Sequence, residues 1–328
     1  MRFMINIFVT YRCNMHCPYC FASHLKAVQK KDMTLGDFQR LLAWMRGAGV
    51  VMAGFIGGEP TLHPNLKEMM KMTRDAGISV TLFTNATFDP RLVSEVASHV
   101  DNFVVNYNDP EIYPSRTLQD RLHENLTRLS QKGARMTFSK NFSPSYSGYA
   151  YLLEGARHYG VRAIRYDISR PASLRENEYF TGDETREVTG KIVSFVQACE
   201  AEGIKTGLDC CMKFCDLSHS DRTFLERVSM KFTGICHPSI DIHPDLSASY
   251  CLPMSHVQVP DVTAFPSQEA VRHHFAAAVR PLRYEISLAA CSSCNFFKRR
   301  CQGGCLATKQ HEALVPNGPK TSMEETVR

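Results

Sequence analysis

The sequence predicts an α/β protein built as a partial (β/α)6 parallel barrel, followed by a small, irregular and cysteine-rich C-terminal domain. Two features of the 328 residues lead to this prediction. Short stretches rich in β-branched and aromatic residues alternate with helix-like stretches through the first two-thirds of the chain. Cysteines then become frequent and the regular periodicity weakens. We expect the barrel over residues 1–214, the cysteine-rich domain over 215–311 and a disordered tail over 312–328.

The alternation places six strands in the first domain, at about residues 3–10, 50–56, 78–84, 102–107, 135–140 and 161–168. Helices are expected between them, at about residues 34–46, 65–76, 90–99, 116–132 and 148–159. A further helix at about 183–202 and a strand at 204–209 should close the domain. Thr34 and Asp37 fit a capping box, and glycines follow three of the helices, as C-cap residues do, at Gly77, Gly133 and Gly160. Because each strand returns through a helix, the sheet should be parallel. The alternation fades near residue 210, whereas a full eight-fold barrel needs ~250 residues, so a partial barrel is expected.

Charge and composition exclude some classes of protein. The net charge is +5, from 38 basic and 33 acidic residues, which is far from a nucleic-acid-binding balance. The apolar N-terminus is about ten residues long, too short for a membrane span, and it has no small-residue cleavage site. We therefore expect a cytoplasmic protein with no membrane or nucleic-acid partner. In that reducing compartment its 13 cysteines indicate metal binding rather than disulfides.

Three cysteines follow the first predicted strand, in the pattern Cys13-x3-Cys17-x2-Cys20. Three thiolates in eight residues can hold a [4Fe–4S] cluster with one iron left open, whereas four would close it. An open iron can chelate the amino and carboxylate groups of S-adenosylmethionine (SAM). An electron from the cluster would then release a 5′-deoxyadenosyl radical. The alternatives are a zinc site completed by His16 or His24, or unligated core cysteines.

The second strand ends in Gly57-Gly58-Glu59-Pro60, a tight turn that a ligand can approach closely. With the cysteine loop and Tyr19 before its last cysteine, the chain resembles the radical SAM superfamily over residues 3 to about 210. That resemblance implies that Gly57, Gly58 and Glu59 hold the amino group of SAM. Polar residues at later strand ends are candidates for SAM contacts, or alternatively for caps and Asx turns: Asn85 (followed by Ala86 where the family often has glycine), Asn106 and Asn108 after the fourth strand, and Ser139, Lys140 and Asn141 after the fifth. Arg165 and Tyr166 could each face the barrel cavity or the helices.

The later cysteines run Cys210-Cys211-x3-Cys215, Cys236-x14-Cys251 and Cys291-x2-Cys294-x6-Cys301-x3-Cys305. This pattern resembles the SPASM/twitch-type auxiliary iron–sulfur domain. The resemblance implies an inner cluster on Cys236, Cys251, Cys305 and Cys215, with Cys210 or Cys211 as possible replacements for Cys215. It implies an outer cluster on Cys291, Cys294 and Cys301. Leu246 stands where the family has glycine, and no cysteine follows Cys305, so the outer cluster would use His311, leave an iron open or be absent. A zinc ribbon is the alternative, and Cys199 is expected to be an ordinary buried thiol.

The resemblance implies a radical SAM enzyme that cleaves SAM reductively and abstracts hydrogen from a substrate. Oxidative modification of a peptide or protein is the expected reaction, with flavodoxin or ferredoxin as electron donor. Because the chain begins almost directly at the first strand, any leader-peptide recognition is expected to need a separate protein. One alternative is a dehydrogenase or epimerase acting on a small molecule such as an aminocyclitol or sugar. An alternative of another class is a non-catalytic iron–sulfur or zinc binding protein.

Overall fold

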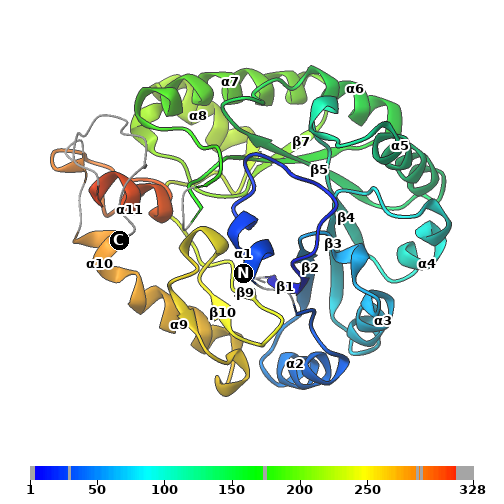
Figure 1. Cartoon of the computed structure of the whole chain (residues 1–328). Coiled ribbons are helices and arrows are strands. Elements are labelled where there is room, and N and C mark those ends of the chain that lie inside the picture. The colour runs from blue at the N-terminus through cyan, green and yellow to red at the C-terminus, as the bar shows by residue number, and fades with distance from the viewer. Residues whose placement is uncertain (1–3, 29–30, 173–175, 286–287, 289–290, 315–328) are drawn as a thin grey trace, which may run out of the picture.

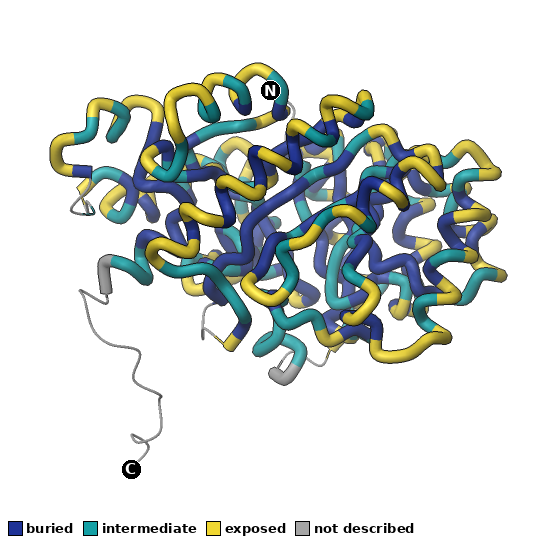
Figure 2. The backbone as a smooth tube through the Cα atoms, turned by 90° about the horizontal axis from the view of Figure 1, so that it is seen from above, coloured by how far each residue is buried: buried dark blue, intermediate teal, exposed yellow. Residues whose placement is uncertain are grey.

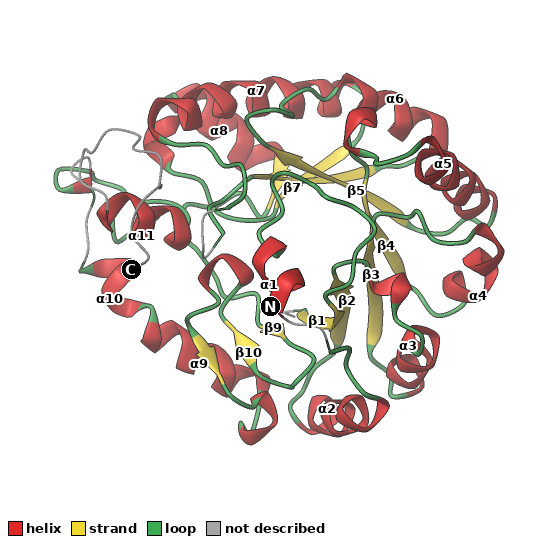
Figure 3. Cartoon of the chain, viewed as in Figure 1, coloured by secondary structure: helices red, strands yellow, loops and turns green. Residues whose placement is uncertain are grey.

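One curved, open sheet forms the centre of the molecule, and helices surround it (Figures 1 and 3). A computed structural model of the chain describes residues 4–28, 31–172, 176–285, 288 and 291–314. In these residues the sheet has eleven strands in the order β11-β10-β9-β1-β2-β3-β4-β5-β6-β7-β8. The mixed α/β class and the open parallel barrel predicted from the sequence are confirmed.

The parallel part of the sheet consists of strands that pair in chain order, from the first to the eighth. They are β1 (Ile5–Thr10), β2 (Met52–Gly57), β3 (Ser79–Thr84), β4 (Asn102–Asn106), β5 (Met136–Phe142), β6 (Ala163–Ile168), β7 (Lys205–Leu208) and β8 (Ser229–Met230). Seven of these coincide with predicted strands to within three residues at either end. β8 is two residues long and has no sequence pattern that marks it.

Helices follow the strands, and those of the barrel cover the convex side of the sheet, whereas α1 (Ser23–Val28) lies within its curve (Figure 1). Those of the barrel are α2 (Leu35–Gly47), α3 (Leu66–Asp75), α4 (Val93–Ala97), α5 (Arg116–Gln131), α6 (Ala150–Tyr159) and α7 (Gly182–Ala201). The others are α1 (Ser23–Val28), α8 (His219–Val228), α9 (Gln268–Ala278), α10 (Arg280–Tyr284) and α11 (Leu306–Leu314). The 3-10 turns are η1 (Pro60–Leu62), η2 (Pro90–Leu92), η3 (Pro110–Ile112), η4 (Phe214–Asp216), η5 (Leu252–Met254) and η6 (Val262–Ala264).

The predicted helix ends are confirmed where the structure describes them. The Thr34 hydroxyl accepts a hydrogen bond from the backbone N–H of Asp37 at 3.0 Å and so caps α2. Gly160 ends α6 in the left-handed conformation, with φ of 70°. The last helix, α11, runs to Leu314, and the remainder of the predicted tail lies outside the described residues.

The cysteine-rich region joins the same sheet at both edges, which the sequence analysis did not predict. β9 (Asp241–Ile242) pairs in parallel with β1, and β10 (Ala248–Ser249) and β11 (Gln258–Val259) continue antiparallel from it. The opposite edge receives β8. Ile240 and Ile242 are 0% exposed and share one hydrophobic core with Ile5 and Ile7 of β1.

Burial follows this layered arrangement. Figure 2 shows buried backbone through the middle of the molecule and exposed segments on the surrounding helices. The largest fully buried side chains are aromatic, and several belong to strands β2, β4 and β5. In the described residues no helix is long and apolar enough to cross a membrane.

Candidate cofactor site

The three cysteines predicted to hold the first cluster lie on the loop that follows β1. Cys13, Cys17 and Cys20 are all partly exposed. The thiols are electrostatic neighbours, since Cys20 and Cys13 both act on Cys17. Burial is the main cause that raises the pKa of Cys17 to about 12, and the neighbouring thiols add to it. In the protein alone the neutral thiol is therefore favoured. A bound metal centre would displace the thiol protons and hold the three sulfurs together.

Gly57 and Gly58 bring the end of β2 against the backbone of this cysteine loop. The Gly58 N–H donates to the Thr10 carbonyl at 2.8 Å, and the Glu59 N–H donates to the Arg12 carbonyl at 2.7 Å. A Cβ atom at Gly57 would lie 2.2 Å from the Thr10 carbonyl oxygen, and one at Gly58 would lie 2.2 Å from that of Arg12. Only glycine permits so close an approach. The turn expected to contact SAM therefore lies directly beside the loop expected to hold the cluster.

The Glu59 carboxylate is buried inside this turn, with 1% exposure. Its Oε1 accepts hydrogen bonds from the Thr61 N–H at 3.2 Å, the Thr61 hydroxyl at 2.6 Å and the Thr84 hydroxyl at 2.8 Å. Its Oε2 accepts from the Asn85 N–H at 2.7 Å. Burial raises the pKa of Glu59, and the donors from Thr61, Asn85 and Thr84 partly offset that rise. The side chain thus ties the turn after β2 to the end of β3.

Asn85 is engaged in a similar way. Its amide donates to the side-chain oxygen of Asn14 in the cysteine loop at 2.8 Å, and its own side-chain oxygen accepts from the Thr87 N–H at 2.9 Å. Asn85 is 7% exposed. These bonds link the third strand end to the cysteine loop, so Asn85 positions the loop whatever else it contacts.

Tyr19 anchors the other side of the loop. Its buried hydroxyl donates to the Asn108 side chain and accepts from the Asn106 side chain, the latter at 3.1 Å. The Asn108 amide also lies 3.9 Å from the Cys17 sulfur. Three predicted features, the aromatic residue, the last two cysteines and the fourth strand end, are therefore brought together.

A row of polar residues crosses the concave face of the sheet beyond this loop. Asn106 of β4 pairs in register with Ser139 of β5, which pairs with Arg165 of β6. The Arg165 guanidinium lies 5.1 Å from the centre of the Phe83 ring on β3 and pairs with Asp209. Arg165 therefore lies on the concave face of the sheet, a choice that the sequence left open.

Tyr166 faces the opposite way. It is 0% exposed, packs on Phe195 of α7 and hydrogen-bonds to the Ser229 hydroxyl. Asp209, directly after β7, was not predicted as a site residue. Asn141 was among the polar residues expected at this strand end, and it lies two residues beyond Ser139 on the same face of β5.

The C-terminal cysteines do not all gather where they were expected. The thiols of Cys236, Cys251 and Cys305 are neighbours, as predicted for inner ligands, and those of Cys210 and Cys211 lie against Cys305. Cys215, by contrast, is exposed and has the thiol of Cys301 as its neighbour. Cys291 lies near Cys301 and Cys294. Cys199 is buried in α7, in agreement with an ordinary core thiol.

The histidines named as alternative ligands are placed elsewhere. His16 is exposed, and His24 pairs with Glu176 at 3.2 Å. His311 lies beside Tyr179, with its Nε2 3.3 Å from the tyrosine hydroxyl. Across the described part of the chain, no three Cys, His, Asp or Glu side chains lie close enough to hold a single metal ion.

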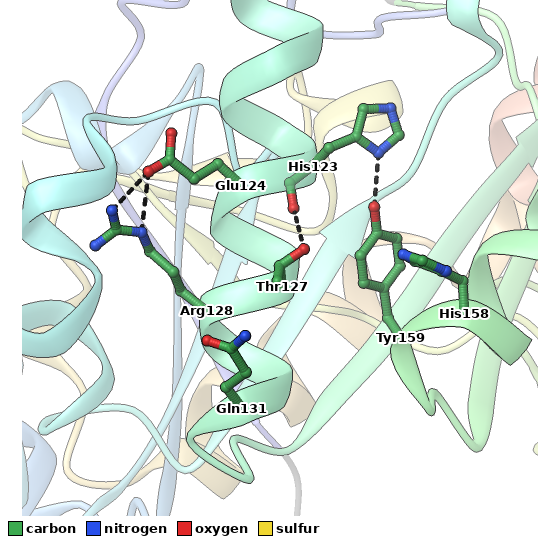
Figure 4. Close-up of a pocket in the computed structure, with 7 residues that line it drawn as sticks. All are labelled: His123, Glu124, Thr127, Arg128, Gln131, His158 and Tyr159. Atoms are coloured by element: carbon green, nitrogen blue, oxygen red, sulfur yellow. Dashed lines mark hydrogen bonds and ion pairs between the residues drawn. The ribbon is translucent and has the colours of Figure 1, made fainter.

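A separate hollow lies on the outer surface, between α5 and α6 (Figure 4). It is lined by His123, whose Nδ1 is 2.7 Å from the Tyr159 hydroxyl, and by the exposed pair of Arg128 and Glu124. These residues belong to helices on the convex side of the sheet, so this hollow is distinct from the concave face beside the cysteine loop.

Residues 7–123, which include the cysteine loop and the Gly57–Glu59 turn, match the family model described as the radical SAM superfamily. Over these residues the chain is similar to the radical SAM superfamily. Among curated proteins, a SAM-dependent nucleotide dehydratase of Selenomonas ruminantium is 32% identical over 96 residues, 28% of this chain and 34% of that protein. A PqqA peptide cyclase of Bradyrhizobium diazoefficiens is 33% identical over 90 residues, 27% of this chain and 24% of that protein. A GTP 3′,8-cyclase of Chlorobaculum tepidum is 31% identical over 125 residues, 37% of this chain and 38% of that protein. The chain thus matches less than two-fifths of the length of each of these relatives.

Solved structures resemble the fold well beyond the radical SAM domain. Streptococcus suis SuiB bound to SAM has a TM-score of 0.68 and 15% identity, over 93% of this chain and 73% of SuiB. Native anSMEcpe with bound SAM and a Kp18Cys peptide has a TM-score of 0.68 and 14% identity, over 93% of this chain and 89% of that one. At this identity the likeness concerns the fold, and it extends through the cysteine-rich region.

Proposed function

We propose that this protein is a radical SAM enzyme that modifies a peptide or protein oxidatively. The observation that carries the proposal is the placement of three thiols, on the loop after β1, against the Gly57–Glu59 turn. The two segments are joined by the backbone bonds from Gly58 to Thr10 and from Glu59 to Arg12, at 2.8 and 2.7 Å. That juxtaposition suits a cofactor that must touch a cluster and a tight backbone turn at once.

Cys13, Cys17 and Cys20 would hold a [4Fe–4S] cluster, and the turn at Gly57 and Gly58 would receive the methionyl end of SAM. When bound, such a cluster with one open iron supplies the electron that cleaves SAM to methionine and a 5′-deoxyadenosyl radical, which takes a hydrogen atom from the substrate. The protein itself would orient the two groups. Tyr19, Asn106 and Asn108 hold the loop, and Glu59 and Asn85 hold the turn.

A peptide substrate is supported by the side chains on the concave face of the sheet and by the relatives. The concave face offers a charged pair, Arg165 with Asp209, beside an aromatic ring and the amides of Asn106 and Asn141. Such mixed surfaces suit the backbone and side chains of a peptide. One solved structure of SuiB has the precursor peptide SuiA bound, and one relative is a peptide cyclase. The auxiliary cysteines would hold iron–sulfur clusters that accept an electron from the substrate. Flavodoxin or ferredoxin would supply the electron that starts SAM cleavage.

The test is anaerobic reconstitution of the full chain with iron and sulfide, followed by SAM and dithionite. The wild-type protein should form 5′-deoxyadenosine. A variant with Cys13, Cys17 and Cys20 all replaced by alanine should form none, yet keep the iron bound by the C-terminal cysteines. The matched control is Cys199→Ala, which removes a thiol of α7 and should leave the reaction intact. Normal SAM cleavage by the triple variant would refute the assignment.

A small-molecule substrate is the second candidate, because two of the reported relatives act on nucleotides according to their names. The two candidates separate by which compound raises 5′-deoxyadenosine formation above the substrate-free rate. A short peptide encoded beside this chain's gene should do so under the first proposal. A nucleotide or an aminocyclitol should do so under the second.

A further inference from the structure

The ten cysteines beyond residue 198 include two spatial groups of thiols. We define the inner group as Cys210, Cys211, Cys236, Cys251 and Cys305. Each of these thiols has at least one other member of the group as an electrostatic neighbour. The Tyr250 hydroxyl donates to the Cys236 sulfur at 3.4 Å. Cys211, Cys236 and Cys305 are 2%, 8% and 5% exposed.

The second set, which we call the outer group, consists of Cys215, Cys291, Cys294 and Cys301. Cys291 has Cys301 and Cys294 as neighbours, and Cys215 has Cys301. The backbone at Gly303 also packs close to this group, because a Cβ there would lie 3.7 Å from the Cys291 sulfur. Cys215 is exposed, whereas Cys211, only four residues earlier, is buried in the inner group. The chain enters the η4 turn between them, and the two thiols are thereby separated.

Backbone and ring contacts place η4 beside the segment that contains Phe296 and Cys301. The Phe214 ring lies 5.6 Å from that of Phe296, whose carbonyl accepts the Cys301 N–H at 3.0 Å. On the adjoining segment, Met212 N–H donates to the Thr233 carbonyl, and Gln302 N–H donates to the Gly234 carbonyl, both at 3.0 Å. The position of Cys215 beside Cys301 therefore follows from the path of the chain and not from one side-chain rotamer.

Buried cations accompany both groups. The inner group has Arg170, which donates to the Cys211 carbonyl at 2.9 Å, and Arg283, which donates to the Cys236 carbonyl at 2.7 Å. The outer group has Lys309, which is 0% exposed, donates to the Arg283 carbonyl at 3.1 Å and has Cys291 and Cys301 as neighbours. Among the described residues Lys309 forms no salt bridge with a carboxylate. Nearby negative charge stabilises a buried ammonium group, and thiolates around a metal centre would supply it.

We propose that Cys215 is the fourth ligand of the outer auxiliary cluster, together with Cys291, Cys294 and Cys301. The inner cluster then takes Cys236, Cys251, Cys305 and one thiol of the Cys210–Cys211 pair. This proposal rests on the auxiliary clusters of the proposed function and moves Cys215 out of the inner site, where sequence resemblance put it. Both clusters become closed, with four protein thiolates each, so neither needs His311 or an open iron.

The deciding measurement is the protection of individual thiols in anaerobically reconstituted, full-length protein. Bound metal shields its cysteines from iodoacetamide, and peptide mass spectrometry locates each alkylated residue. Cys215→Ser should expose Cys291, Cys294 and Cys301 to alkylation and remove up to about four irons, one cluster's worth. The inner group and the cysteine loop after β1 should stay protected.

The reciprocal variant carries Cys210→Ser and Cys211→Ser together. It should expose Cys236, Cys251 and Cys305 while the outer group stays protected. Cys199→Ser is the matched control and should change nothing.

Exposure of Cys236, Cys251 and Cys305 by Cys215→Ser would overturn the proposal, and so would continued protection of every thiol in that variant. Zinc in place of iron at the protected outer thiols would overturn it as well. Failure of the proposed function is distinguishable, because it would appear as absent 5′-deoxyadenosine formation while the protection pattern of the C-terminal thiols remained readable.

Discussion

At the scale of single residues, the site depends on polar groups that hold backbone rather than on groups that reach outward. Glu59 accepts four hydrogen bonds inside its turn, and Asn85 bridges that turn to the cysteine loop. The Gly57–Glu59 turn, which the resemblance predicts to contact SAM, joins β2, β3 and the cysteine loop. Stability and cofactor binding should therefore change together when this joint is altered.

Replacement of Glu59 by glutamine tests that coupling. The amide would turn an NH2 group toward at least one of the four donors, and a buried unsatisfied donor costs about 1–3 kcal/mol. We expect Glu59→Gln to lower both the melting temperature and SAM affinity, measured by thermal unfolding and equilibrium binding. Glu68→Gln, on the exposed side of α3, is the control and should change neither. Weaker SAM binding with unchanged stability would mean that the carboxylate contacts SAM directly, contrary to this expectation.

Site residues could be predicted from the sequence where a short local motif identifies them, and not where their neighbours depend on the path of the chain. The Cys13–Cys20 spacing and the two glycines are such local motifs. Cys215 does not, because its neighbour Cys301 is 86 residues away and η4 decides which thiols it meets. Arg165 and Tyr166 were ambiguous since both faces of a parallel barrel sheet are covered, so alternation does not say which face is the cavity.

At the scale of elements, long periodic segments were predictable and very short strands were not. The barrel helices and β1 to β7 were expected within a few residues of their observed ends. β8 to β11 have two residues each and exist because a neighbouring strand is there to pair with. α11 begins directly after Cys305 and places Lys309 beside the outer group of cysteines.

Replacement of Lys309 by methionine tests the role of that helix. If the outer thiolates hold a cluster, loss of the buried positive charge should make the cluster harder to reduce and shift its potential to a more negative value. A redox titration followed by electron paramagnetic resonance should detect the shift. Lys132→Met, on the exposed end of α5, is the control and should leave every potential unchanged. An unchanged spectrum and potential in Lys309→Met would argue against a cluster beside this lysine.

At the scale of the whole molecule, the barrel and the cysteine-rich region share one sheet and one core. β9 lies along β1, where Asn6 donates to the Asp241 carboxylate at 2.8 Å, and the other oxygen of that carboxylate accepts from the Leu252 N–H at 2.9 Å. Leu252 directly follows Cys251 of the inner group. The inner group is thereby connected through two hydrogen bonds to the first strand of the barrel, whose end carries the Cys13–Cys20 loop.

This shared sheet predicts that the barrel does not fold alone. A chain of residues 1–214 would leave β1 without β9 and β7 without β8, so two strand edges would be open, and unpaired edges promote aggregation. It would also uncover Ile5 and Ile7, which pack in one core with Ile240 and Ile242. We expect this fragment to be aggregated in size-exclusion chromatography and to bind no SAM. A chain of residues 1–314 keeps every contact described here and should retain the melting temperature and monodispersity of the full chain, which makes it the matched control. A monodisperse, SAM-binding 1–214 fragment would mean that the boundary near residue 215 separates two independent domains, and that the strands shared across it contribute little to the stability of the barrel.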